Sequence, residues 1–122
     1  MTILYIHQYF CTPQEPGGTR SYWIAKKLID SGHKVFMLTS RKFDKNTKKY
    51  TIIDGINVIY LNVDYSQKMN FITRIFSFIN FSFRSLIEAI KLTSKIDLVY
   101  ATSTPLTVGF PALFLNFIFK KR

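Results

Sequence analysis

Two adjacent glycines, Gly17 and Gly18, lie in a loop between an apolar segment and a helical pattern. Glycine has no Cβ, so this pair accepts positive φ angles and lets a ligand come close to the backbone. The amide groups that begin the following helix favour an anion. The spacing is neither G-x-G-x-x-G nor that of a P-loop. The pair therefore predicts either a phosphate-binding loop or a tight turn between strand and helix.

Further polar residues directly follow apolar runs that are typical of buried strands. His7 follows the first run, and the hydroxyl residues Thr102, Ser103 and Thr104 follow a later one at residues 97–101. Parallel sheets bind ligands at the carboxyl ends of their strands, so we expect these side chains to share one edge with the glycines. For His7, we favour a packing or hydrogen-bonding role over a catalytic one.

The overall charge indicates an anionic partner. The chain carries 17 Lys and Arg against 7 Asp and Glu, a formal net charge of +10. A membrane surface, a phosphorylated substrate or a nucleic acid would each satisfy this charge. The sequence has no arginine-rich run, zinc spacing or RNA-binding aromatic motif, so we do not expect nucleic acid to be the partner.

The remaining chemistry-bearing residues are few. Cys11 is a single cysteine, which excludes an internal disulfide, and with His7 and His33 it forms no metal-ligand cluster; no metal is expected. The first residues lack the basic segment of a secretory signal. These features predict a cytoplasmic protein.

The elements that position these residues alternate between strand and helix patterns. Strands are predicted at residues 3–6, 35–39 and 97–101, and helices at residues 19–31 and 67–94. Residues 50–63, with a turn at Asp54 and Gly55, form either an antiparallel hairpin or one strand with an irregular start. The order predicts an α/β fold, a Rossmann-like three-layer domain with a mostly parallel sheet spanning residues 1–122.

The longest helical pattern, residues 67–94, has two faces of interest. Its apolar stripe is expected to pack into the core and consists of Met69, Ile72, Phe76, Ile79, Phe83, Leu86 and Ile90. Phe71, Phe78 and Phe81 fall off this stripe, beside Arg74. Aromatic residues with an arginine on an outward face are typical of a helix that lies against lipid headgroups. Packing against a second domain or a subunit is an equal alternative.

Two other segments bear on membrane contact. The basic stretch at residues 41–50 includes Lys45, Lys48 and Lys49 and is either a solvated loop or a rim that attracts anions. With Arg74, Phe78 and Phe81, these lysines are the membrane-contact candidates. The apolar run at residues 108–119 is too short to span a bilayer and predicts a buried helix.

The ends of the chain carry a resemblance to a known family. The segment ILYIHQYFCTPQEPGGTRSYWIAKKLIDSGHKVFMLTS resembles the opening of family 4 glycosyltransferases of the GT-B fold, in which a strand, a Gly-Gly loop, a helix and a GH-x-V strand follow in that order. The segment DLVYATSTPLTVGFPALFL is similar to a later strand and helix of the same domain. The middle of the chain diverges from the family.

The resemblance implies a function. It implies the N-terminal, acceptor-side half of a retaining sugar-nucleotide transferase of bacterial surface-polysaccharide assembly, peripheral on the inner face of the cytoplasmic membrane. Gly17 and Gly18 would close over the donor diphosphate, and Arg20 would reach a phosphate or only solvate the helix. The nucleotide sugar is a substrate, no cofactor is implied, and the acceptor is a lipid-linked or glycan molecule.

The family also implies a second domain, which grips the nucleotide through a Glu-x₇-Glu motif. Glu15 and Glu88 are too far apart to form that motif, so the donor domain is expected to be absent from these residues. A separately encoded C-terminal half is then an expected partner, and the chain alone is expected to be inactive. The alternative is a membrane- or partner-binding α/β module without catalysis.

Overall fold

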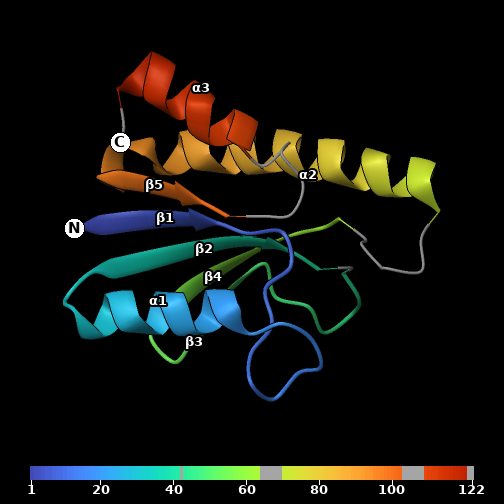
Figure 1. Ribbon diagram of the computed structural model, residues 1–122, viewed down its shortest axis with the longest axis horizontal. Helices are drawn as coiled ribbons and strands as arrows, with labels where there is room; N and C mark the ends of the chain where they lie inside the picture. The colour runs from blue at the N-terminus through green and yellow to red at the C-terminus, as the bar shows by residue number, and fades with distance from the viewer. Residues whose placement is uncertain (42, 64–69, 103–108, 121–122) are drawn as a thin grey trace.

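The computed structural model describes residues 1–41, 43–63, 70–102 and 109–120, which form an α/β fold (Figure 1). A five-stranded sheet lies between helices on its two faces. The elements in chain order are β1 (Thr2–Ile6), α1 (Arg20–Asp30), β2 (Lys34–Ser40), β3 (Tyr50–Ile53), β4 (Ile56–Leu61), α2 (Phe71–Leu92), a short 3-10 turn (Thr93–Lys95), β5 (Leu98–Ala101) and α3 (Gly109–Phe119).

The sheet is mostly parallel, as the sequence predicts. Its strand order is β3-β4-β2-β1-β5, and only the β3–β4 pair is antiparallel. The turn between β3 and β4 contains Asp54 and Gly55, with φ angles of 50° and 86°. Asp and Gly tolerate this left-handed conformation, which gives the tight connection a hairpin needs. The hairpin, of the two alternatives, is therefore correct.

Both faces of the sheet are covered, because side chains alternate along each strand. On β1, Leu4 and Ile6 join the core beneath α2 and α3, whereas Tyr5 joins the core beneath α1. Figure 1 shows α1 on one side of the sheet and both other helices on the opposite side. This placement gives the apolar runs of β1 and β2 a buried environment on each side.

Helix α2 faces the sheet with a different side from the one predicted. Its buried residues are Ser77, Phe81, Ser85, Glu88 and Ala89. The predicted core stripe instead points outward: Phe76 and Phe83 are each 67% exposed. The small residues let the helix approach the sheet closely, and Phe81 fills the space among the aliphatic side chains of β1 and β2.

This orientation corrects the prediction that Phe81 contacts lipid, since its side chain is completely buried. Phe78, the other predicted aromatic contact, is half-buried.

Helix α3 is more exposed than the sequence predicts. It begins at Gly109, but Leu115 is buried whereas Leu113, Phe117 and Ile118 are exposed, so it is not the buried helix predicted.

A buried carboxylate fastens α2 to the β3 edge of the sheet. Lys49 Nζ donates to Glu88 Oε1 at 2.5 Å, Lys91 Nζ donates to the same oxygen at 3.3 Å, and Tyr50 Oη donates to Oε2 at 3.4 Å. Burial raises the pKa of Glu88, but hydrogen bonds and charges from the two lysines outweigh it and leave the pKa below its usual value. Lys49, a predicted membrane contact, thus balances the charge of this buried carboxylate, and its side chain is 37% exposed.

This pairing predicts a loss of stability in acid. Because the pKa of Glu88 is lower in the folded state, its contribution is present above the unfolded pKa of about 4.3 and disappears as the pH falls through the folded value. We expect the free energy of unfolding, measured in urea, to fall between about pH 5 and pH 3. In Glu88→Gln this fall should be smaller. An equal fall in both proteins would show that other carboxylates cause it.

Candidate functional site

The candidate site lies at the carboxyl ends of β1 and β5, which are neighbours in the sheet. The chain leaves β1 toward α1 on one face and reaches α3 on the opposite face after β5 (Figure 1). Open α/β sheets bind ligands at such a point, because the diverging connections leave a crevice between them. Thr102 N donates to Ile6 O at 3.1 Å and continues the pairing to the edge itself.

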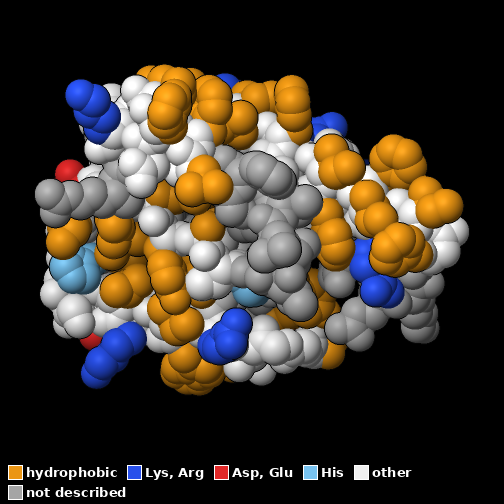
Figure 2. Space-filling view, turned by 45° about the horizontal axis from the view of Figure 1, so that its top comes forward, with side chains coloured by type: hydrophobic (Ala, Val, Ile, Leu, Met, Phe, Trp, Pro, Cys, Tyr) orange, Lys and Arg blue, Asp and Glu red, His pale blue; other side chains and the backbone are white. Residues whose placement is uncertain are grey.

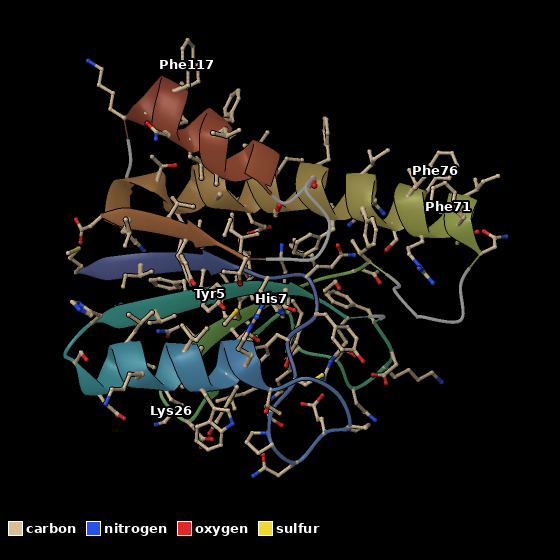
Figure 3. All side chains as sticks on the ribbon, viewed as in Figure 1. Tyr5, His7, Lys26, Phe71, Phe76 and Phe117 are labelled. Carbon is tan, nitrogen blue, oxygen red and sulfur yellow. The ribbon has the colours of Figure 1, made fainter. Side chains whose placement is uncertain are left out.

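His7, Thr102 and Tyr5 form a hydrogen-bonded group at this edge. His7 Nδ1 lies 2.6 Å from Thr102 O and 3.2 Å from Thr102 Oγ1. Since a carbonyl oxygen only accepts, Nδ1 carries the proton and Nε2 is the acceptor of the ring. Thr102 Oγ1 in turn donates to Tyr5 Oη at 2.9 Å. Figure 3 shows Tyr5 and His7 close together near the end of β1.

The surroundings of His7 lower its pKa and so favour the neutral ring. Burial lowers the pKa of His7, hydrogen bonds with the backbones of Thr102 and Tyr9 oppose this effect, and the positive charge of Arg20 lowers the pKa further. Arg20, the first residue of α1, therefore acts electrostatically on the same group. A neutral imidazole can accept a hydrogen bond from a hydroxyl of a ligand, whereas an imidazolium cannot.

The loop between β1 and α1 is held by its own side chains and by the end of β2. Thr12 Oγ1 donates to Glu15 Oε1 at 3.1 Å, and Arg41 Nη2 donates to Glu15 Oε2 at the same distance. The Arg41 guanidinium stacks 4.5 Å above the centre of the Tyr60 ring. These contacts tie the loop to the end of β2, and an ordered loop loses less conformational entropy when a ligand binds.

The two glycines of the loop have different surroundings. Gly17 has φ +129°, and a Cβ there would lie 2.9 Å from Cys11 Sγ and 3.2 Å from the Tyr9 ring. Gly17 is thus required by the turn itself. A Cβ on Gly18 would meet no atom of the described residues within 4 Å, so this glycine faces open space. Of the pair, Gly18 is the position at which a ligand has room to approach.

Helix α1 begins directly after the glycines. Thr19 occupies the N-cap position but makes no side-chain cap. The first intrahelical bond runs from Trp23 N to Thr19 O at 3.2 Å. The backbone N–H groups before Trp23 in this first turn are therefore not bonded within the helix. Together with Arg20, this turn offers positive potential to an anion at the edge of the sheet.

The structure thus joins His7 to Thr102, puts the charge of Arg20 within reach of His7, and places the glycine loop before α1. Ser103 and Thr104 lie outside the described residues. The basic candidates are not part of this hydrogen-bonded group. Lys48 lines an open groove of about 370 Å³ with Glu15, Arg41 and Asp44, Lys45 is exposed in the same loop, and Arg74 is half-buried on α2.

Sequence reasoning missed two contributors to this edge. Tyr5 has the sequence context of an ordinary core residue, and only its alternation with His7 along the strand could place it below the histidine. Arg41 belongs to a stretch that looks like a solvated basic loop, although its position directly after a predicted strand puts it at the ligand edge. Its pairing with Glu15 has no signal in the sequence.

Comparison with protein-family models, curated proteins and solved structures found no match to this chain. Within the described parts of the chain, no His, Cys, Asp and Glu side chains gather as a metal-binding group. Of the helices in those parts, none has the length and apolar character to cross a bilayer.

Proposed function

We propose that this chain is the N-terminal, acceptor-side half of a sugar-nucleotide-dependent glycosyltransferase, a Rossmann-like domain of the GT-B type. The observation that supports the proposal is the His7–Thr102 pair at the β1–β5 edge, with Arg20, the residue that begins α1 after the glycine loop, near enough for its charge to act on His7. The resemblance of the sequence to family 4 glycosyltransferases supports the same function. The acceptor is a lipid-linked or glycan molecule reached from the inner face of the cytoplasmic membrane.

The proposed chemistry follows from the groups present. A nucleotide-sugar donor gains negative charge on its diphosphate as the sugar leaves, and fixed amides stabilise that charge without reorganising. The first turn of α1 and Arg20 supply such positive potential, and Gly18 leaves space for the phosphates. The His7 ring, neutral and fixed by Thr102, would accept a hydrogen bond from a sugar hydroxyl.

The proposal predicts that the purified chain transfers no sugar by itself. One wall of a two-domain cleft cannot hold donor and acceptor in reacting geometry. Correct positioning of two reactants lowers the activation barrier by about 7–11 kcal/mol. The test incubates the chain with radiolabelled nucleotide sugars and membrane lipid extract, with and without a Glu-x₇-Glu domain supplied in trans. Turnover by the chain alone would contradict the division of roles between the halves.

A second candidate function is a membrane- or partner-binding α/β module without catalysis. The observation that favours it is the apolar outer surface of α2 and α3, which the fold does not use. Isothermal titration with nucleoside diphosphates separates the two candidates. With a Glu-x₇-Glu domain supplied in trans, a gain in saturable binding on addition of the native chain that is lost with Thr102→Val favours the transferase half, and no such gain from the folded chain favours the module.

A further inference from the structure

The outward side of α2 carries a continuous apolar surface. Its exposed hydrophobic residues are Phe71, Ile72, Ile75, Phe76, Ile79, Phe83, Ile87 and Ile90. At about 100° per residue these positions cover less than half of the helix circumference, opposite the side that holds Phe81. A large exposed apolar patch on a folded domain marks a contact with a partner or a lipid surface.

Contacts with the rest of the fold fix this orientation. On the inner side, Gln8 Nε2 donates to Ser77 Oγ at 3.3 Å and Lys49 Nζ donates to Glu88 Oε1 at 2.5 Å. Phe81 lies between these two points in the core. The helix therefore cannot turn its apolar side to the sheet without breaking buried polar contacts, which would leave their partners unsatisfied.

Helix α3 extends the surface. It packs on α2 through its buried residue Leu115, and its exposed residues include Leu113, Phe117 and Ile118, of which Phe117 is 84% exposed. Figure 2 shows hydrophobic side chains gathered over this part of the molecule, with Lys and Arg side chains among them. In Figure 3, Phe71, Phe76 and Phe117 all point away from the sheet. We call this the α2–α3 surface.

The charges on the outer side of these helices have one sign. Arg84 and Lys91 lie beside the apolar stripe of α2, about 50° beyond its edge, and Lys120 directly follows α3. Among the described residues of the two helices, Glu88 is the carboxylate, and it is buried and paired with lysines. An apolar surface flanked by cations complements a bilayer that contains anionic lipid.

We propose that the α2–α3 surface docks on an anionic phospholipid bilayer, with the phenylalanines among the headgroups and the basic flank at the phosphates. A seam between two copies of α2 would bring like charges together, because the flanking residues Arg84 and Lys91 are basic. The net charge of +10 also makes a second copy repel the first. Both points favour lipid over self-association.

The first turns of α2 extend past the sheet on the side of the strands' carboxyl ends, whereas the glycine loop lies with α1 on the opposite face of the sheet (Figure 1). The inference names the partner of the second candidate function and needs no sugar transfer, so its failure would leave the transferase proposal untouched.

The test measures sedimentation of the full chain with vesicles of phosphatidylcholine, with and without phosphatidylglycerol. We expect binding to the anionic vesicles that weakens at least about tenfold at high salt, because salt screens the basic flank. The variant Phe71→Ser/Phe76→Ser should lose binding about tenfold or more, with its circular dichroism and melting temperature unchanged. Trp23→Ser on α1, 57% exposed in the native chain, is the matched control and should bind normally.

Several results would overturn the inference. A folded native chain that ignores anionic vesicles at low salt would do so, as would equal loss of binding in Trp23→Ser. Analytical ultracentrifugation provides a further check: a native dimer that the double variant turns into a monomer would assign the α2–α3 surface to a second copy. A native monomer that binds vesicles supports the bilayer.

Discussion

Replacing Phe81 by alanine should lower the free energy of unfolding by about 3–5 kcal/mol. The side chain is completely buried and packs in the core with Leu4, Ile6 and Leu38. Its removal loses the transfer free energy of the ring and leaves a cavity that the rigid sheet cannot close. Urea unfolding of the native chain and the variant measures the difference.

Phe83→Ala is the matched control for this prediction. Phe83 lies two residues further along α2 but is 67% exposed, so its loss should change the free energy of unfolding by only about 0.5 kcal/mol. A large loss in Phe83→Ala together with a small loss in Phe81→Ala would mean that α2 presents its apolar stripe to the sheet. That result would also remove the basis for a bilayer contact.

Substitution of the two glycines should separate their role in forming the turn from their role in binding the ligand. Gly18→Val puts a side chain into open space, so we expect little change in stability but about a hundredfold loss of sugar transfer when the second domain is supplied. The added methyl groups would displace the donor diphosphate from the loop. Melting temperature and initial transfer rate are the two measurements.

Gly17→Val provides the contrast. Its φ of +129° and the closeness of Cys11 Sγ to the added Cβ should destabilise the loop, so stability and transfer fall together. If Gly18→Val transfers sugar at the native rate, the diphosphate does not lie against this glycine. If both variants are destabilised alike, the pair serves only the turn.

The order and type of the elements were predictable because each has a local signal. The apolar runs of β1 and β2, the Asp54-Gly55 turn and the helix after the glycines depend on residues close together in the chain. The facing of α2 was not predictable in this way. Its periodicity identifies an apolar stripe but not what covers it, and the decisive contact pairs Lys49 with Glu88, 39 residues apart.

The candidate site also has a part that the sequence predicts and a part that it does not. The meeting of His7 and Thr102 follows from two strands in one parallel sheet, so the general rule for sheet edges suffices to predict it. The bond between Glu15 and Arg41 joins two irregular segments, for which side-chain positions decide everything. Ser103 and Thr104 lie outside the described residues, so their predicted place at the edge stays a prediction.

The pairing of β1 with β5 has a consequence for the order in which the protein assembles. His7 and Thr102 are 95 residues apart, whereas β1, β2 and β4 are joined by shorter connections. The entropy of closing a loop grows with its length, and long-range pairs form late in folding. During synthesis, the first four strands can therefore pair before α2 and β5 have emerged from the ribosome. The ligand edge comes into existence only when the last strand joins the sheet.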